Sequence, residues 1–77
     1  MAKHNFQIVI EQDEDGIYVA SVPSLQGCYA QGDTFEEVVK NIKDVIEMII
    51  NELKEEGKKI PRPYSEIIGF KRVTVTV

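Results

Sequence analysis

One long amphipathic pattern, from Phe35 to Leu53, constrains the fold more than any other feature of the sequence. Its apolar residues recur every three or four positions, the period of a helix with one buried face: Phe35, Val38, Val39, Ile42, Val45, Ile46, Ile49, Ile50 and Leu53. Thr34 and Glu37 have the spacing of a capping box, and Gly57 suits a helix end. The pattern predicts one helix from about residue 35 to near residue 57.

Three short segments before this helix have the patterns of antiparallel strands. Phe6, Ile8 and Ile10 occupy alternate positions, and Asp15-Gly16 supplies the tight turn after which residues 17–22 return as a second strand. Pro23 lacks a backbone N–H and ends that strand. Residues 28–31 then form the third predicted strand.

Two further segments follow the helix. The sequence "IPRPY" at 60–64 predicts a stiff, extended connector, because each proline fixes its own φ and disfavours helix at the residue before it. In "FKRVTVTV" at 70–77, alternate positions are occupied by valine, which predicts a fourth strand.

Together these elements predict an α+β fold of the order β-β-β-α-β. We expect residues 1–77 to form a single domain, in which an antiparallel meander carries one long helix on one sheet face and the last strand lies parallel to the first. One helix leaves the other sheet face, with Val9 and part of the second strand, without cover. A chain of 77 residues also has a thin core. We therefore expect a homodimer or a higher homo-oligomer.

Charge is unevenly distributed along the chain. Residues 1–56 hold twelve acidic side chains against four lysines, a net charge of −8, whereas residues 57–77 hold five basic side chains against one glutamate. An acidic body disfavours nucleic acid and favours a basic partner, because phosphate binding depends on Lys and Arg. The candidate partner-binding residues lie around the first predicted turn: Glu11, Asp13, Glu14 and Asp15. The alternative is that these charges only keep a small domain in solution.

Cys28 is the only cysteine and His4 the only histidine, so this pair is the sole candidate for thiol catalysis. His4 lies next to the chain terminus, and no basic residue is near Cys28 in the sequence, which favours a structural, buried thiol. One Cys and one His also do not suffice for a closed zinc site. We expect no metal, no cofactor and no enzymatic activity.

Other chemistries find little support in the sequence. Glu11 and Glu47 are candidate metal ligands of a nuclease, but the last predicted strand contributes no acid to complete the set. The glycines match no phosphate-binding loop. Tyr64 and Phe70 in the basic segment are too few and too far apart to make an obvious stacking platform for nucleic acid.

Asn41 is a polar residue beside the apolar stripe of the predicted helix. We expect its amide to bond backbone groups of residues 26–32, the alternative being a solvated side chain.

The combined motifs carry a resemblance to a known family. The run "GIYVASVPSLQGCYAQGDTFEEVVKNIKDVIEMII" contains V-P-x-L-x-G-C, then G-D-T, then E-E-x-x-x-N-I, and it closely resembles HicB antitoxins of HicA/HicB type II toxin–antitoxin systems. The similarity extends from about Phe6 to Pro61. It implies a partial ribonuclease H-like fold without nuclease activity, oligomerisation, and a HicA-like toxin protein as partner.

The resemblance also implies how such a protein acts. HicA-type toxins are small basic ribonucleases that use a histidine, and HicB-like proteins neutralise them by covering that site. Many HicB proteins continue into a DNA-binding domain, whereas this sequence ends at Val77, so we do not expect direct DNA binding. Cysteine usage and the absence of a leader-like start or of a long apolar run favour a cytoplasmic protein without membrane insertion. The alternative function is an oligomeric RNA- or nucleotide-binding module without a toxin partner.

Overall fold

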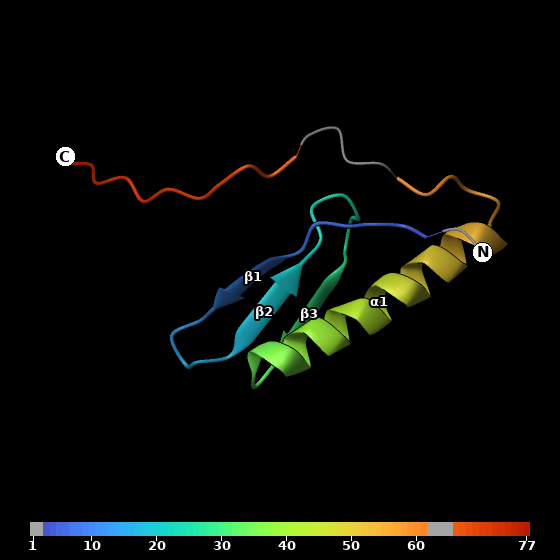
Figure 1. Cartoon of the computed structure of the whole chain (residues 1–77), viewed down its shortest axis with the longest axis horizontal. Helices are drawn as coiled ribbons and strands as arrows, with labels where there is room; N and C mark the ends of the chain where they lie inside the picture. Colours follow the sequence, from blue (N-terminus) through green and yellow to red (C-terminus); the bar gives the residue numbers. More distant parts are fainter. Residues whose placement is uncertain (1–2, 62–65) are drawn as a thin grey trace.

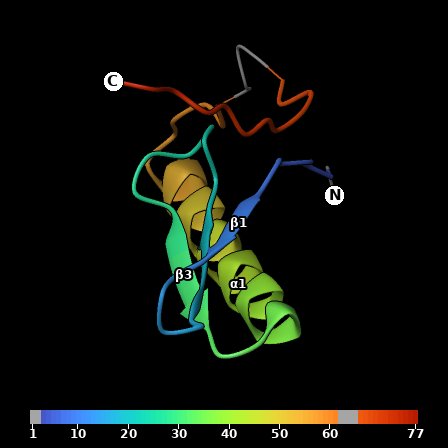
Figure 2. The ribbon, with the colours of Figure 1, turned by 90° about the vertical axis from the view of Figure 1, so that its left-hand side faces the viewer.

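The computed structural model describes residues 3–61 and 66–77, and its order of elements is β-β-β-α. The strands β1 (Val9–Gln12), β2 (Tyr18–Ser21) and β3 (Tyr29–Gly32) form an antiparallel sheet in the order β1-β2-β3. The helix α1 (Phe35–Glu55) covers one face of this sheet, as the two views of Figures 1 and 2 show. The predicted α+β meander with one long helix is confirmed.

The turn between β1 and β2 is organised by Asp13. Its carboxylate accepts hydrogen bonds from the backbone N–H groups of Asp15 and Ile17, each at 2.9 Å. Gly16 adopts a φ of 84°, a conformation that suits glycine. The hairpin then pairs Ile10 with Ala20. The predicted turn position is therefore confirmed, and Asp13 contributes to its structure.

The first strand begins at Val9, later than the alternation that starts at Phe6 indicates. Val9 pairs with Ser21, which is the last residue of β2. Residues 6–8 thus have no partner strand in β2. Phe6 and Ile8 still pack against the core, as their pattern predicts.

Residues 22–28 fold into a compact loop that is part of the core. Leu25 donates its N–H to Val22 at 3.0 Å, and Cys28 donates to Leu25 at 3.3 Å. The side chains of all three residues are buried. Gly27 makes the bend at a φ of 74°. This loop closes the core beyond the ends of β2 and β3.

Local signals define both ends of α1. Thr34 has extended backbone angles, and its hydroxyl accepts the N–H of Glu37 at 3.1 Å, as an N-cap does. At the other end, Gly57 donates to Lys54 at 3.1 Å and Lys58 donates to Leu53 at 2.9 Å. These two bonds form a Schellman motif around the positive φ of Gly57. The predicted helix and its ends are confirmed.

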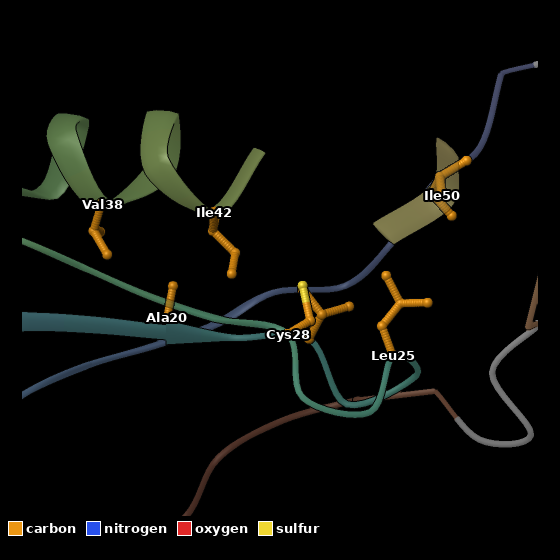
Figure 3. Close-up of a cluster of buried hydrophobic side chains, with 7 residues drawn as sticks. Ala20, Leu25, Cys28, Val38, Ile42 and Ile50 are labelled. Carbon is orange, nitrogen blue, oxygen red and sulfur yellow. The ribbon is translucent and has the colours of Figure 1, made fainter. Parts of the chain in front are cut away.

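The core lies between α1, β2 and the 22–28 loop. Figure 3 shows Val38, Ile42 and Ile50 of the helix facing Ala20 and the loop residues. The buried residues form one cluster: Ala20, Val22, Leu25, Cys28, Val38, Ile42 and Ile50. No helix within the described residues is long and apolar enough to cross a bilayer.

The predicted fourth strand is absent from the sheet. Residues 66–77 are described, but they have no strand structure, and Val73, Val75 and Val77 are exposed. Alternation makes a segment suitable for a sheet, but a strand also needs an edge that accepts its backbone hydrogen bonds, and this chain does not place the segment along β1. Part of the predicted 60–64 connector, residues 62–64 with Tyr64, lies outside the described residues.

Candidate functional site

The sheet face opposite α1, called here the open face, has no cover within the described residues. Ala20 and Ala30 pair with each other and point toward the helix, so their neighbours along each strand point the other way. The open face therefore consists of Val9, Glu11, Val19, Ser21, Tyr29 and Gln31. Tyr29 is 66% exposed. The face combines apolar and polar side chains, a composition suited to protein contact.

The acidic residues predicted for partner binding lie at one end of this face. Glu11 is on the open face, and Glu14 and Asp15 are exposed in the turn that follows β1. Asp13 is also exposed, but its carboxylate is engaged by the two backbone N–H groups of the turn. We call Glu11, Asp13, Glu14 and Asp15 the acidic tip. Within the described residues, the carboxylates of Glu11, Glu14 and Asp15 make no hydrogen bond that would fix their direction.

Cys28 is a core residue in this structure. Its side chain is 1% exposed, and burial raises the pKa of the thiol above its ordinary value, because an apolar surrounding disfavours the thiolate. His4 instead lines a groove between the N-terminal segment and α1, with Lys43 and Asn51. The predicted structural role of Cys28 is consistent with this placement.

The two candidate nuclease carboxylates lie on different layers. Glu11 is on the open face of the sheet, whereas Glu47 lines the groove between α1 and the N-terminal segment. Within residues 3–61 and 66–77, no three His, Cys, Asp or Glu side chains are grouped as metal ligands would be. The fold thus separates the pair that the sequence suggested.

Asn41 joins α1 to the sheet. Its side-chain amide donates to the backbone carbonyl of Gln31 in β3 at 2.7 Å. This contact confirms the expected bond to residues 26–32. It lies one residue from Gly32, where a Cβ atom would be 2.6 Å from the backbone nitrogen of Val38. The glycine permits the close approach of α1 to β3, and the asparagine then bonds the two elements together.

Replacing Asn41 with alanine should lower the free energy of unfolding by about 1 kcal/mol, because the Gln31 carbonyl loses its donor. Asn51 on the exposed surface of α1 provides the matched control, since the same substitution there changes helix propensity equally. Urea denaturation of both variants measures the difference. Equal stabilities would contradict a stabilising role for the Asn41 bond.

The described fold and surfaces define a small two-layer α+β domain with an uncovered sheet face bordered by acidic side chains. Comparison with known proteins identifies the family to which this domain belongs. The family model of the HicB-like antitoxin of bacterial toxin–antitoxin systems matches residues 6–71. The chain belongs to the HicB-like antitoxin family.

Curated relatives support the assignment over most of the chain. A UPF0150 protein of Synechocystis is 44% identical over 75 residues, which cover 97% of this chain and 100% of the relative. A UPF0150 protein of Thermoplasma acidophilum is 46% identical over 63 residues, 82% of this chain and 91% of the relative. A second Synechocystis relative is 42% identical over 59 residues, 77% of this chain and 75% of its own length.

Family membership supports an antitoxin role and implies a toxin partner in general, and it suggests a role other than catalysis. Sequence reasoning missed two features of these surfaces. The first is the position of Tyr29 on the open face. Because alternate strand positions point to opposite faces, counting outward from a buried Ala20 places Tyr29 there, so the sequence contains this signal. A second feature, a contact between Gln7 and Ile67, joins residues sixty positions apart and has no local signal.

Proposed function

We propose that this protein neutralises a small basic ribonuclease toxin of the HicA type by binding it, and that it has no enzymatic activity of its own. Residues 1–77 act in this proposal as a single HicB-like domain in the cytoplasm. The observation that carries the proposal is the acidic tip beside the open face, in a chain that belongs to an antitoxin family. A basic enzyme would find complementary charge and apolar contact there.

Electrostatics supports this partner in particular. Residues 1–56, which include all three strands and the helix, carry a net charge of −8 from twelve acidic residues and four lysines. Opposite charge raises the rate at which two proteins meet and orients them for docking. The exposed carboxylates of Glu11, Glu14 and Asp15 give this charge a defined position on the surface.

A charge-reversal experiment tests the position of the interface. The double variant Glu14→Lys, Asp15→Lys should bind the toxin about 30-fold more weakly, since two attractive charges become repulsive. Asp13 remains unchanged because its carboxylate organises the turn. The toxin is a small basic protein of the HicA type, sought in the reading frame beside this gene, co-expressed and purified, and affinity is measured by calorimetry.

The matched control is Glu52→Lys, Glu55→Lys, which makes the same change of charge on exposed positions near the end of α1. We expect this control to weaken binding by about threefold or less, because long-range charge is screened by salt. Equal losses in the two double variants would show that only net charge matters. The absence of any complex with the wild-type chain would remove the toxin proposal itself.

We also propose that the chain forms a homodimer or higher oligomer. Tyr29 on the open face and several apolar side chains of residues 66–77 are exposed, and Val9 and Val19 on the open face are half-buried. Exposed apolar surface of this kind marks association sites. Sedimentation at micromolar concentration tests this proposal, and a stable monomer would contradict it.

The second candidate function is an RNA- or nucleotide-binding module without a toxin partner. The observation in its favour is the groove between the N-terminal segment and α1, which is lined by Lys3, His4, Lys43 and Lys54, with Glu47 among them. Binding of this kind would weaken steeply with salt, because phosphate contacts release counterions. Salt-dependent binding of the purified chain to RNA, without any protein partner, would favour this candidate.

A further inference from the structure

Residues 66–77, which follow the connector, have the composition of a strand but no strand structure. Their exposed apolar side chains include Phe70 at 82%, Val73 at 76% and Val75 at 72% exposure. Valine and threonine alternate from residue 73 to residue 77, and both residue types favour extended structure. In water the apolar side chains of this segment stay exposed at a cost in free energy, while its backbone N–H and C=O groups bond to solvent and can exchange those bonds for a sheet.

The start of this segment is nevertheless fixed beside the sheet. The Gln7 side chain accepts the N–H of Ile67 at 2.9 Å and donates to the carbonyl of Ile67 at 3.4 Å. The side-chain amide of Gln7 therefore bonds both the N–H and the C=O of Ile67. A residue on a neighbouring strand would bond the same two backbone groups. Gln7 is two residues before β1, so this contact places the segment close to the N-terminal end of that strand.

The edge of β1 is an available partner for a strand. β1 pairs with β2 alone in a sheet of order β1-β2-β3. α1 packs against β2 and β3 and not against β1, so the helix does not block the outer backbone edge of β1. An uncovered sheet edge presents backbone groups that accept an added strand. Charge agrees, since Lys71 and Arg72 of the segment are opposite in sign to Glu11 of β1 and to the turn that follows it.

Within residues 3–61 and 66–77, no strand pairs with the outer edge of β1. Figure 1 shows residues 70–77 running apart from the three strands, and Figure 2 shows the same separation from the side. The segment is also longer than the edge, because residues 70–77 extend about 26 Å as a strand, whereas the four residues of β1 extend about 13 Å. A second copy supplies another β1 edge. It also supplies further backbone groups with which the residues that extend past this edge can pair.

We propose that residues 70–77 of one copy pair as a strand with the β1 edge of a second copy, and that the second copy returns the same contact. Such a two-fold exchange is closed, since each copy gives one strand and receives one. It buries Val73, Val75 and Val77 on one side of the added strand. The inference rests on the self-association proposed above, and it names the segment responsible.

Truncation separates the two proposals. A chain ending at Gly69 should be a monomer at concentrations where the full chain is a dimer, as measured by sedimentation velocity. Circular dichroism should show that the truncated chain keeps α1, since residues 70–77 contribute nothing to the core cluster. A truncated chain that remains a dimer overturns the strand exchange and leaves self-association intact. A monomeric full chain overturns both.

Proline substitutions test for a strand within the dimer. In a strand added at an edge, only alternate residues donate N–H groups to the neighbour. Of the variants Thr74→Pro and Val75→Pro, one should raise the dimer dissociation constant by at least about tenfold and the other by much less. The control Val75→Thr removes apolar contact but keeps the N–H. Equal effects of the two prolines would overturn pairing by a β-ladder.

Isotope mixing identifies which copy receives the strand. Labelled and unlabelled chains are unfolded together and refolded, and contacts between the Val73 or Val75 methyl groups and β1 are recorded by isotope-filtered NMR. Contacts between copies are expected. Contacts found only within one copy would place the strand on its own β1 edge and overturn the exchange.

Discussion

Replacing Ile42 with alanine should lower the free energy of unfolding by about 3 kcal/mol, the largest effect that we expect from a single substitution. Ile42 has no exposed surface and is among the largest fully buried side chains described. Figure 3 shows it pointing from α1 into the space beside Ala20 and Cys28. The truncation leaves a cavity, and a small core has few other contacts to compensate. Urea denaturation at constant chain concentration measures the loss.

Met48 provides the control for this substitution, because it lies on the same helix and is 54% exposed. Met48→Ala should change the free energy of unfolding by about 0.5 kcal/mol or less, as is usual for surface positions. If the two variants unfold at the same urea concentration, Ile42 does not occupy the position described here.

Replacing Gly32 with alanine should destabilise the protein by about 2 kcal/mol or more, through overpacking. A Cβ atom at this position would lie 2.6 Å from the nitrogen and 2.9 Å from the Cα of Val38. Both are backbone atoms within the first turn of α1, so no side-chain rotation relieves the contact. The helix must move away from β3, which also stretches the nearby bond between Asn41 and Gln31. Thermal and urea denaturation measure the effect.

The matched control for Gly32 is Gly69→Ala. A Cβ atom at Gly69 meets nothing within 4 Å, and its φ is not positive. The same substitution should therefore change the free energy of unfolding by less than about 0.5 kcal/mol. A loss at Gly32 no greater than at Gly69 would show that the helix and β3 are not in close contact there.

Local patterns predicted much of this fold. The three-four spacing from Phe35 to Leu53 and the Thr34 cap predict α1, because both act between residues a few positions apart. The Asp15-Gly16 turn predicts the hairpin for the same reason. The strand bounds were less accurate, since β1 starts only where β2 offers a partner at Ser21.

The candidate surface was predicted in part. The burial of Cys28 and the bond from Asn41 to residues 26–32 are confirmed, whereas partner binding by the acidic tip stays a prediction. The role of Asp13 in the turn was missed, although an aspartate two residues before Asp15-Gly16 is a signal for a carboxylate that accepts turn N–H groups.

The fourth strand shows the limit of such patterns. Alternation in residues 73–77 describes a backbone and side-chain arrangement that a sheet can accept, but it does not say which edge accepts it. The bond between Gln7 and Ile67 bridges most of the chain, and no short-range signal encodes it. The prediction of a fourth strand in this chain's own sheet was therefore wrong.

The sequence by itself determined the helix, its caps, the hairpin turn and the family, because each depends on residue types at short or fixed spacings. Only the tertiary structure decided that Gly32 lets α1 approach β3, that Glu11 and Glu47 lie on different layers, and that residues 66–77 leave the β1 edge uncovered. These facts depend on distances between segments remote in the chain, which are set by packing.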